Sequence, residues 1–392
     1  MRVACIGNMN NNYFSVTRFL RDRGIDADLL LLKNELAHFH PSTDTFDLDY
    51  QRYTKNLRWG DPFRFTKTDA AEVASDLRDY DFIVGCDTSP AFANKVNRRL
   101  DMFIPYGTDL FFHPFFRLVN PRHQYDNYMF GKSQRAAIEN ARFIVMDLTN
   151  DEAEETLKRL NVHGQRLVLG FPMVYTPIYN PQSISQFYDR SHWYHEFKRI
   201  RDAHDLVIFH HSRHSWKNSE DRFSWKGNDK LWRGFAQFVA AHPDVKAAIV
   251  TCERGVDVNE TKRLTRELGL EDRVFWFPQM ARKDVMVGLS LADVGSGEFN
   301  WSWLSCGTVY ETLAMAKPLM HYRDDSLYRH HYQELYPLMN VHTEEEIAEA
   351  LADYLRRPDY YRSMGEQGRA WFQRYAIDEP LDEYVRIIES SK

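Results

Sequence analysis

Three charged residues in the second half of the chain have the types and positions that bind a nucleoside diphosphate. Arg213 follows an apolar run, and Lys226 precedes a glycine that opens a predicted helix. One planar guanidinium and one point charge together suit a diphosphate. Glu311 lies early in a helix after another glycine, where a carboxylate suits the hydroxyls of a ribose. Together the three residues predict a nucleotide-sugar site.

The elements that must position these residues are predicted to form two parallel α/β domains. Short apolar runs alternate with amphipathic stretches along both halves of the chain, a pattern typical of strands joined by helices. Residues 177–205 interrupt it, are rich in Pro, Ser, Asn and aromatics, and are predicted to be a linker with a short helix. We expect Rossmann-like domains at 1–176 and 206–372, with ligands beyond the carboxyl ends of their strands.

Composition narrows the function classes. The chain has 392 residues, is 43% hydrophobic and carries a net charge of −6, which gives no support for nucleic-acid binding. The four cysteines are scattered, and we expect buried, reduced thiols. There is no secretory-type segment and no apolar run near the ~18 residues of a membrane span, so we expect a cytoplasmic location.

Several segments, in this order, resemble the GT-B glycosyltransferases of the retaining family 4 type. They include AAIENARFIVMDLTNDEAEETL in the first half, then LEDRVFWFPQMARKDV, GTVYETLAMAKP and the terminal GEQGRAWFQRYAIDEPLDEYVRII. The resemblance spans nearly the whole chain. It implies an α/β, GT-B fold with two Rossmann-like domains facing across a central cleft. It also implies a C-terminal helix, at about 373–392, that crosses back to the first domain.

The resemblance implies roles for individual residues. Arg213 and Lys226 should hold the donor diphosphate, and Glu311 should bond the ribose. Lys226 lies 13 residues after Arg213, farther than is usual in the family, which implies a loop insertion at 217–224. Backbone atoms after the strand RVFW should frame the base. The expected donor-binding residues are Arg213, Lys226, Phe277, Pro278, Gln279, Glu298, Gly307, Thr308 and Glu311.

Two positions depart from the family. The first carboxylate should lie eight residues before Glu311, where this chain has Trp303; Glu298 is nearby but offset by five. A histidine that often precedes GTD is Tyr106 here, and a tyrosine is a poor base near neutral pH because its ordinary pKa is about 10. The expected catalytic residues are Arg213, Lys226, Asp109 and Tyr106.

The acceptor is expected on the first domain. The candidate residues there are Asn8, Asn10, Asn11, Asp87 and Arg58. The asparagines follow the first strand, where they could bond a sugar or cap a helix, and both interpretations are open. The basic and aromatic stretch 52–67 also has two interpretations: a contact with an anionic lipid or glycan, and a solvated loop with packed aromatic rings.

No metal site is expected. His210, His211 and His214 lie close in sequence but lack carboxylate or cysteine partners at zinc-site spacing. Asp47 and Asp49 imitate the DxD motif of metal-dependent glycosyltransferases, but they lie in an irregular loop.

These features predict a cytoplasmic hexosyltransferase that needs no cofactor. Its partners would be a UDP- or GDP-type sugar, a glycan, lipid-linked or small hydroxyl acceptor, and peripherally the inner membrane face. The leaving diphosphate would be stabilised by Arg213, Lys226 and a helix N-terminus near residues 297–302. Retention would follow from a front-face displacement, as the resemblance implies. Two alternatives stay open: a GT-B sugar epimerase, and an inactive nucleotide-sugar-binding module.

Overall fold

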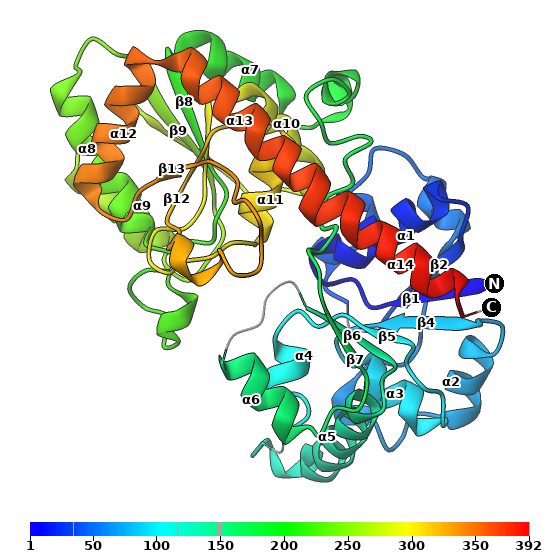
Figure 1. The fold of residues 1–392 in the computed structure, drawn as a ribbon. Coiled ribbons are helices and arrows are strands. Elements are labelled where there is room, and N and C mark those ends of the chain that lie inside the picture. Colours follow the sequence, from blue (N-terminus) through cyan, green and yellow to red (C-terminus); the bar gives the residue numbers. More distant parts are fainter. Residues whose placement is uncertain (34, 116, 147–150, 392) are drawn as a thin grey trace. The chain divides into compact units, whose positions relative to one another are not determined.

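The computed structural model describes residues 1–33, 35–115, 117–146 and 151–391. The chain forms two compact units. The first comprises Met1–Tyr175 and Tyr375–Lys392, and the second comprises Thr176–Arg374. Each unit is built on one parallel β-sheet with helices packed beside it (Figure 1).

The sheet of the first unit has seven strands within the described residues, in the order β3-β2-β1-β4-β5-β6-β7. The strands are β1 (Arg2–Ile6), β2 (Asp26–Leu31), β3 (Thr54–Asn56), β4 (Phe82–Gly85), β5 (Met102–Phe103), β6 (Phe143–Met146) and β7 (Gln165–Val168). The helices of this unit include α1 (Asn12–Asp22), α2 (Ala70–Leu77), α3 (Ser89–Lys95), α4 (Thr108–Phe111), α5 (Gln124–Glu139), α6 (Asp151–Arg159) and α14 (Glu379–Glu389). Val3 to Ile6 are completely buried, because a central parallel strand packs on both of its faces.

The sheet of the second unit has six strands within the described residues, in the order β10-β9-β8-β11-β12-β13. The strands are β8 (Leu206–His210), β9 (Ala247–Cys252), β10 (Val274–Phe277), β11 (Val294–Ser296), β12 (Leu319–His321) and β13 (Met339–Asn340). The helices of this unit include α7 (Tyr194–Ala203), α8 (Asn228–Ala241), α9 (Val258–Glu267), α10 (Arg282–Leu291), α11 (Gly307–Ala314), α12 (Glu344–Arg356) and α13 (Pro358–Phe372).

The C-terminal helix returns to the first unit, as predicted. After α13 the chain makes a π-helical turn over Gln373–Asp378 and continues as α14. α14 packs beside α1, and Arg23 lies 3.5 Å from Asp382 at that contact. The last helix therefore completes the unit that contains the first strand.

Each sheet has a point where the order of its strands reverses. In the first unit the reversal falls between β1 and β4, where Ile6 pairs with Gly85. In the second unit it falls between β8 and β11, where His210 pairs with Ser296. Loops that leave neighbouring strands in opposite directions open a crevice, and ligands of open α/β sheets bind there. Asn8 and Asp87 follow the first pair of strands, and Arg213 and Glu298 follow the second.

Some elements differ from the prediction. The short strands β3 and β13 were not predicted, and the segment 177–205 contains a 3-10 helix over Ile184–Arg190 as well as α7, within the second unit. Residues 297–302 do not form a helix N-terminus, because β11 ends at Ser296 and the next helix begins at Gly307. Among the described residues, no helix combines the length and apolar character needed to cross a bilayer.

Candidate functional site

Lys226 and Glu298 form an ion pair at the reversal point of the second sheet. The ammonium nitrogen of Lys226 lies 2.8 Å from both carboxylate oxygens of Glu298. The two side chains are 14% and 7% exposed, so water screens the pair weakly. Gly227 holds Lys226 in place with φ of +69°, and a Cβ there would lie 3.1 Å from the backbone of Phe299 and Asn300. Both the backbone angle and the close approach favour glycine at this position.

A buried histidine fixes the loop that carries Glu298. His321 accepts a hydrogen bond from the backbone N–H of Glu298 at 2.9 Å through Nδ1, and its Nε2 lies 2.8 Å from the carbonyl oxygen of Trp303. Burial lowers the pKa of His321 to about 4, so the ring is neutral and its Nε2–H donates to that carbonyl. The indole of Trp303 is 39% exposed, and its ring centre lies 5.9 Å from the Lys226 nitrogen. The loop therefore brings both Glu298 and Trp303 near one cation.

Arg213 lies in the loop after β8, and its side chain is exposed. It has no hydrogen bond or ion pair through that side chain among the residues that the structure describes. Its backbone is fixed by Asn228, whose Nδ2 donates to the Arg213 carbonyl at 3.2 Å and whose Oδ1 accepts from Ser215 N at 2.9 Å. Ser215 O in turn accepts from the backbone N–H of Lys226 at 2.6 Å. Asn228 thus couples the two predicted diphosphate ligands, and the sequence did not single it out.

Glu311 lies in α11 between two basic side chains. One carboxylate oxygen is 2.9 Å from Arg282 Nε, and the other is 3.0 Å from His211 Nε2. Burial raises the pKa of Glu311, but His211 and Arg282 outweigh it and the pKa is lowered overall. The side chain is 11% exposed and remains ionised, and each oxygen keeps a lone pair for a further donor.

The site also contains two arginines that sequence reasoning missed. Arg254 follows β9, and Arg282 begins α10. Burial lowers the pKa of Arg254, and repulsion from Arg213 and Arg282 adds to that effect, so the three guanidinium groups share one region. With Glu311 as their neighbouring carboxylate, the cluster keeps a net positive charge. A usable signal was present, because each arginine follows a predicted strand by a few residues.

The segment predicted to frame a base lies at the end of β10, beside a cavity of about 630 Å³. Phe277 and Pro278 line that cavity together with Trp193. The Phe277 ring is buried against Trp193, with ring centres 5.3 Å apart, and its carbonyl accepts from Glu253 N at 2.8 Å. Pro278 and Gln279 are exposed. They are therefore the accessible part of the predicted base-binding segment.

Gly307 and Thr308 occupy the first turn of α11. Both are partly exposed, and a Cβ at Gly307 would lie 3.9 and 4.0 Å from the Glu311 carboxylate oxygens. The free backbone N–H groups of a helix start are anion ligands. The predicted helix N-terminus near 297–302 is wrong, and the helix start after β11 is at Gly307, on the same helix as Glu311.

In the first unit, two of the three predicted asparagines are structural. Asn8 is fully buried; its Nδ2 donates to Asn11 Oδ1 at 2.9 Å, and its Oδ1 accepts from Phe14 N at 2.9 Å. Asn11 is 2% exposed and donates to Thr43 Oγ1 at 3.0 Å. Both side-chain amides hydrogen-bond within their own part of the protein. The interpretation of Asn8 and Asn11 as sugar contacts is therefore wrong, and their role is structural. Asn10 alone of the three is exposed.

The predicted acid and tyrosine of the first unit form one cluster with Asp87, of which only Asp109 is buried. Asp109 is completely buried, and its carboxylate accepts three backbone N–H groups, from Asp87, Tyr106 and Gly107, each at 3.0 Å. Burial raises the pKa of Asp109 to about 7. Burial and then the Asp87 and Asp109 charges raise the pKa of Tyr106, so its hydroxyl stays protonated and bonds Asp87. Asp109 fastens this turn and is completely buried, which counts against its predicted catalytic role, whereas the role predicted for the partly exposed Tyr106 stays a prediction.

Asp87 remains the accessible carboxylate of this cluster. It is 31% exposed, has a left-handed backbone with φ of +55°, and lies 3.8 Å from Nδ1 of His113. Burial lowers the pKa of His113 to about 4, so the ring is neutral. Burial, with the Asp87 charge as the next cause, raises the pKa of Glu35 to about 7. Sequence reasoning missed Glu35 and His113, since neither ends a predicted strand.

The basic and aromatic stretch 52–67 divides by residue type. Trp59 and Phe65 are 1% and 5% exposed and belong to the core, as the interpretation with packed rings expects. Lys55 donates to Tyr80 Oη at 2.8 Å. Arg58 is 88% exposed and reaches Glu72 only at 4.0 Å. Arg58 and the Phe63 ring, which is 41% exposed, are therefore accessible to a partner, whereas Trp59 and Phe65 are not.

Of the residues considered for metal binding, His211 contacts the Glu311 carboxylate, and the other two histidines contact a threonine. His210 and His214 are buried and share Thr251 Oγ1, at 2.9 and 3.1 Å. Asp47 and Asp49 lie at the start of a 3-10 turn. Within the part of the chain that the structure describes, no group of three or more His, Cys, Asp or Glu side chains has the arrangement of a metal site.

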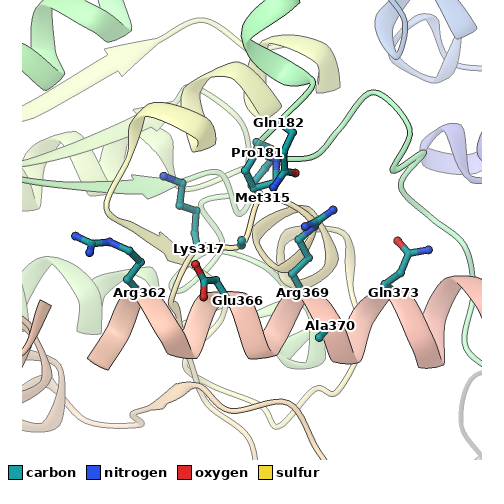
Figure 2. Close-up of a pocket in the computed structure, with 10 residues that line it drawn as sticks. Pro181, Gln182, Met315, Lys317, Arg362, Glu366, Arg369, Ala370 and Gln373 are labelled. Carbon is teal, nitrogen blue, oxygen red and sulfur yellow. The ribbon is translucent and has the colours of Figure 1, made fainter. Parts of the chain in front are cut away.

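A second cavity, of about 570 Å³, lies between α13 and the turn that follows α11. Figure 2 shows Glu366 and Arg369 projecting from α13 toward Met315 and Lys317. None of the predicted site residues lines this cavity, so it is separate from the predicted donor site.

Comparisons with known proteins place this geometry in a fold. No protein-family model matches the chain, and no curated protein matches it in sequence. Solved structures do resemble it over its whole length. They include Anabaena HepE in complex with UDP-glucose (TM-score 0.64, 16% identity), and sucrose-phosphate synthase from Thermosynechococcus elongatus (TM-score 0.61, 15% identity). They also include UDP-GlcNAc 2-epimerase from Neisseria meningitidis bound to UDP-GlcNAc (TM-score 0.57, 13% identity).

In each of these three comparisons the match covers 100% of both chains. The protein has the α/β GT-B fold, so the predicted fold class is confirmed. At these sequence identities the likeness shows the fold only, and the chemistry has to be argued from the residues of the site.

Proposed function

We propose that the protein is a glycosyltransferase that uses a nucleotide-diphosphate sugar, with the nucleotide held by the second unit. The observation that carries this proposal is the set of charges at one sheet edge. Arg213 is free, Lys226 is held by Glu298, and Glu311 is held by two basic side chains. This is the combination that a diphosphate and a ribose require. The names of the three structural neighbours support the proposal, because each mentions a nucleotide sugar or a sugar phosphate.

In the proposed reaction, charge develops on the leaving diphosphate as the glycosidic bond breaks. Arg213 and Lys226 would stabilise that charge, together with the N–H groups at the start of α11. We propose that this positive charge makes a divalent metal unnecessary. Asp109 is buried and Tyr106 stays protonated, which favours a reaction that needs no enzyme base. Retention of configuration through a front-face displacement is part of the proposal.

The first unit would supply the acceptor side, with Asp87, Asn10 and Arg58 as its accessible polar residues. The acceptor would be a glycan, a lipid-linked sugar or a small hydroxyl compound. A UDP-sugar epimerase is the second candidate, because one structural neighbour is named as such an enzyme.

Binding is tested first, by a thermal-shift screen of UDP, GDP, ADP and their sugars. A nucleotide at 100 times its Kd should stabilise the protein by about 2.7 kcal/mol. The absence of any shift would contradict the proposal. The protein is then incubated with the sugar nucleotide that it binds, with and without acceptors and with and without EDTA. The products distinguish a transferase, an epimerase and an inactive module. Acceptor-dependent release of nucleotide supports transfer, release of free sugar without an acceptor supports the epimerase, and binding without turnover supports an inactive module. Loss on chelation, restored by Mn²⁺, would contradict metal independence.

A further inference from the structure

Exposed apolar side chains gather in one short part of the first unit. Among the described residues, 13 large apolar side chains are exposed, and four of them lie within residues 112–128. The four are Leu118 (90% exposed), Tyr125 (68%), Phe112 (53%) and Tyr128 (51%). Single exposed apolar residues are ordinary, whereas a cluster of them marks an interaction surface.

The same part of the chain carries exposed cations. They are Arg117, Arg122, Lys132 and Arg135. We call these four cations and the four apolar residues the 112–135 surface; residue 116 is not part of it. On α5, Tyr125, Tyr128, Lys132 and Arg135 follow the spacing i, i+3, i+7 and i+10, which places them along one face of the helix.

Local contacts join the loop before α5 to that helix. The Arg117 guanidinium carbon lies 4.4 Å from the centre of the Phe112 ring. The Arg117 carbonyl accepts from Asn127 Nδ2 at 2.9 Å and from Gln124 Nε2 at 3.3 Å. The described part of the loop is therefore fastened to the first turns of α5, and the loop lies between α4 and α5 in the chain (Figure 1).

The charge of this surface is opposite to that of the whole protein. Residues 112–135 contain four Lys and Arg and one carboxylate, a net charge of +3, whereas the chain carries −6. The carboxylate is Asp126, which is 5% exposed and accepts from Thr66 Oγ1 at 2.6 Å. The surface thus exposes cations and apolar groups and hides its only acid.

We propose that the 112–135 surface binds the face of an anionic lipid bilayer. Tyrosine and phenylalanine rings with leucine suit the boundary between headgroups and acyl chains, and cations beside them suit anionic headgroups. A nucleic acid would bind the cations through its phosphates but would not bury Leu118, which is the most exposed apolar side chain of the surface. The apolar half of the surface therefore favours a bilayer.

The surface also adjoins the predicted acceptor side. It begins one residue after α4, and His113 within the same segment lies 3.8 Å from Asp87. A bilayer held there would bring a lipid-linked acceptor close to Asp87, and this consequence alone rests on the proposed function.

Vesicle sedimentation of the full-length protein tests the proposal without any nucleotide. The probes are phosphatidylcholine vesicles with and without about 30% phosphatidylglycerol. Three variants are compared: Arg117→Ser with Arg122→Ser, Leu118→Ser alone, and the matched control Arg78→Ser with Arg99→Ser. The control removes two cations from exposed positions of the same unit that lie outside both basic segments. All the substituted side chains are exposed, and equal urea midpoints will verify that the variants fold.

We expect wild type to bind the anionic vesicles and to bind neutral ones far more weakly. The double arginine variant and Leu118→Ser should each weaken binding about tenfold or more, and the control by less than twofold. Binding should also fall as salt rises. Failure of wild type to bind anionic vesicles would overturn the proposal. An equal loss of vesicle binding in the control would also overturn it. So would an unchanged vesicle affinity of Leu118→Ser, because the surface would then act only through its cations, which would bind RNA as well. UDP affinity should be unchanged in all three variants, so this outcome is independent of the proposed function.

Discussion

Replacing Glu298 with Gln should change stability and nucleotide affinity in opposite directions. Glu298 holds both of its oxygens 2.8 Å from the Lys226 nitrogen, and the side chains are 7% and 14% exposed. Truncating one partner of a buried ion pair costs about 3–5 kcal/mol. Glutamine keeps a carbonyl acceptor for Lys226, so we expect a smaller loss of unfolding free energy, about 1–3 kcal/mol.

Nucleotide affinity should rise for an electrostatic reason. A phosphate that binds Lys226 on its free side would lie about 6 Å from the Glu298 carboxylate. At an effective dielectric constant of about 20, two unit charges at that distance repel by roughly 3 kcal/mol. Solvent at an open sheet edge reduces this, and about 1 kcal/mol corresponds to roughly fivefold tighter binding. The variant should therefore bind both UDP and UDP-glucose more tightly.

Urea unfolding and isothermal titration calorimetry measure the two effects. The matched control is Glu271→Gln, which removes one negative charge from an exposed position of the same unit and should change neither quantity. If the midpoint and the UDP affinity of Glu298→Gln both equal those of wild type, the counter-ion argument is refuted. If only the UDP-glucose affinity falls, Glu298 contacts the sugar and its charge does not compete with the diphosphate.

Other substitutions test the remaining assignments. Arg213→Ala and Lys226→Ala should each weaken UDP binding about tenfold to 100-fold, from roughly 1.5–3 kcal/mol per charge-assisted bond, and calorimetry will show whether the loss occurs. Glu311→Gln should weaken the binding of UDP more than the binding of 2′-deoxy-UDP, because only UDP can lose a bond to the ribose 2′-hydroxyl. Equal losses for the two nucleotides would show that Glu311 does not contact that hydroxyl. Burial lowers the pKa of His321 to about 4, below about 6.5 in the unfolded chain, so unfolded chains bind the extra proton and stability falls between pH 6.5 and 4. His321→Gln should make that slope shallower by about 1.4 kcal/mol per pH unit in urea titrations, and an unchanged slope would contradict it. Ala316 has φ of +54°, so Ala316→Gly should raise the unfolding free energy by ~0.5–1 kcal/mol; a lower urea midpoint would count against strain there.

The sheets and their order of elements could be predicted because buried parallel strands are visible in sequence. β1 and β8 are continuous apolar runs, and the helices between strands keep an amphipathic period. β3 and β13 escaped because they are only three and two residues long at the sheet edges, where little apolar surface is buried. Short edge strands carry almost no periodic signal.

Within the site, sequence reasoning identified the loops that carry polar residues, but not which of those residues fasten the loops themselves. Lys226 was predicted because a glycine and a predicted helix follow it, and that glycine does have a left-handed backbone. Asn8 and Asp109 also follow strands, yet their side chains turn inward to bond backbone groups of their own loops. Sequence position does not distinguish a polar side chain that faces a ligand from one that fastens a turn, because both are common after strands.

Glu298 shows that sequence spacing can also miss a residue that does contact a predicted ligand of the diphosphate. Counting back eight residues from Glu311 reaches Trp303, and that count treats the loop between β11 and α11 as having a fixed length and course. The loop instead follows His321, which bonds the backbone at Glu298 and at Trp303 and so sets where each side chain emerges. A carboxylate five residues early thereby reaches Lys226, and the indole lies near the same cation. The course of the loop therefore decides which residue places its carboxylate beside Lys226.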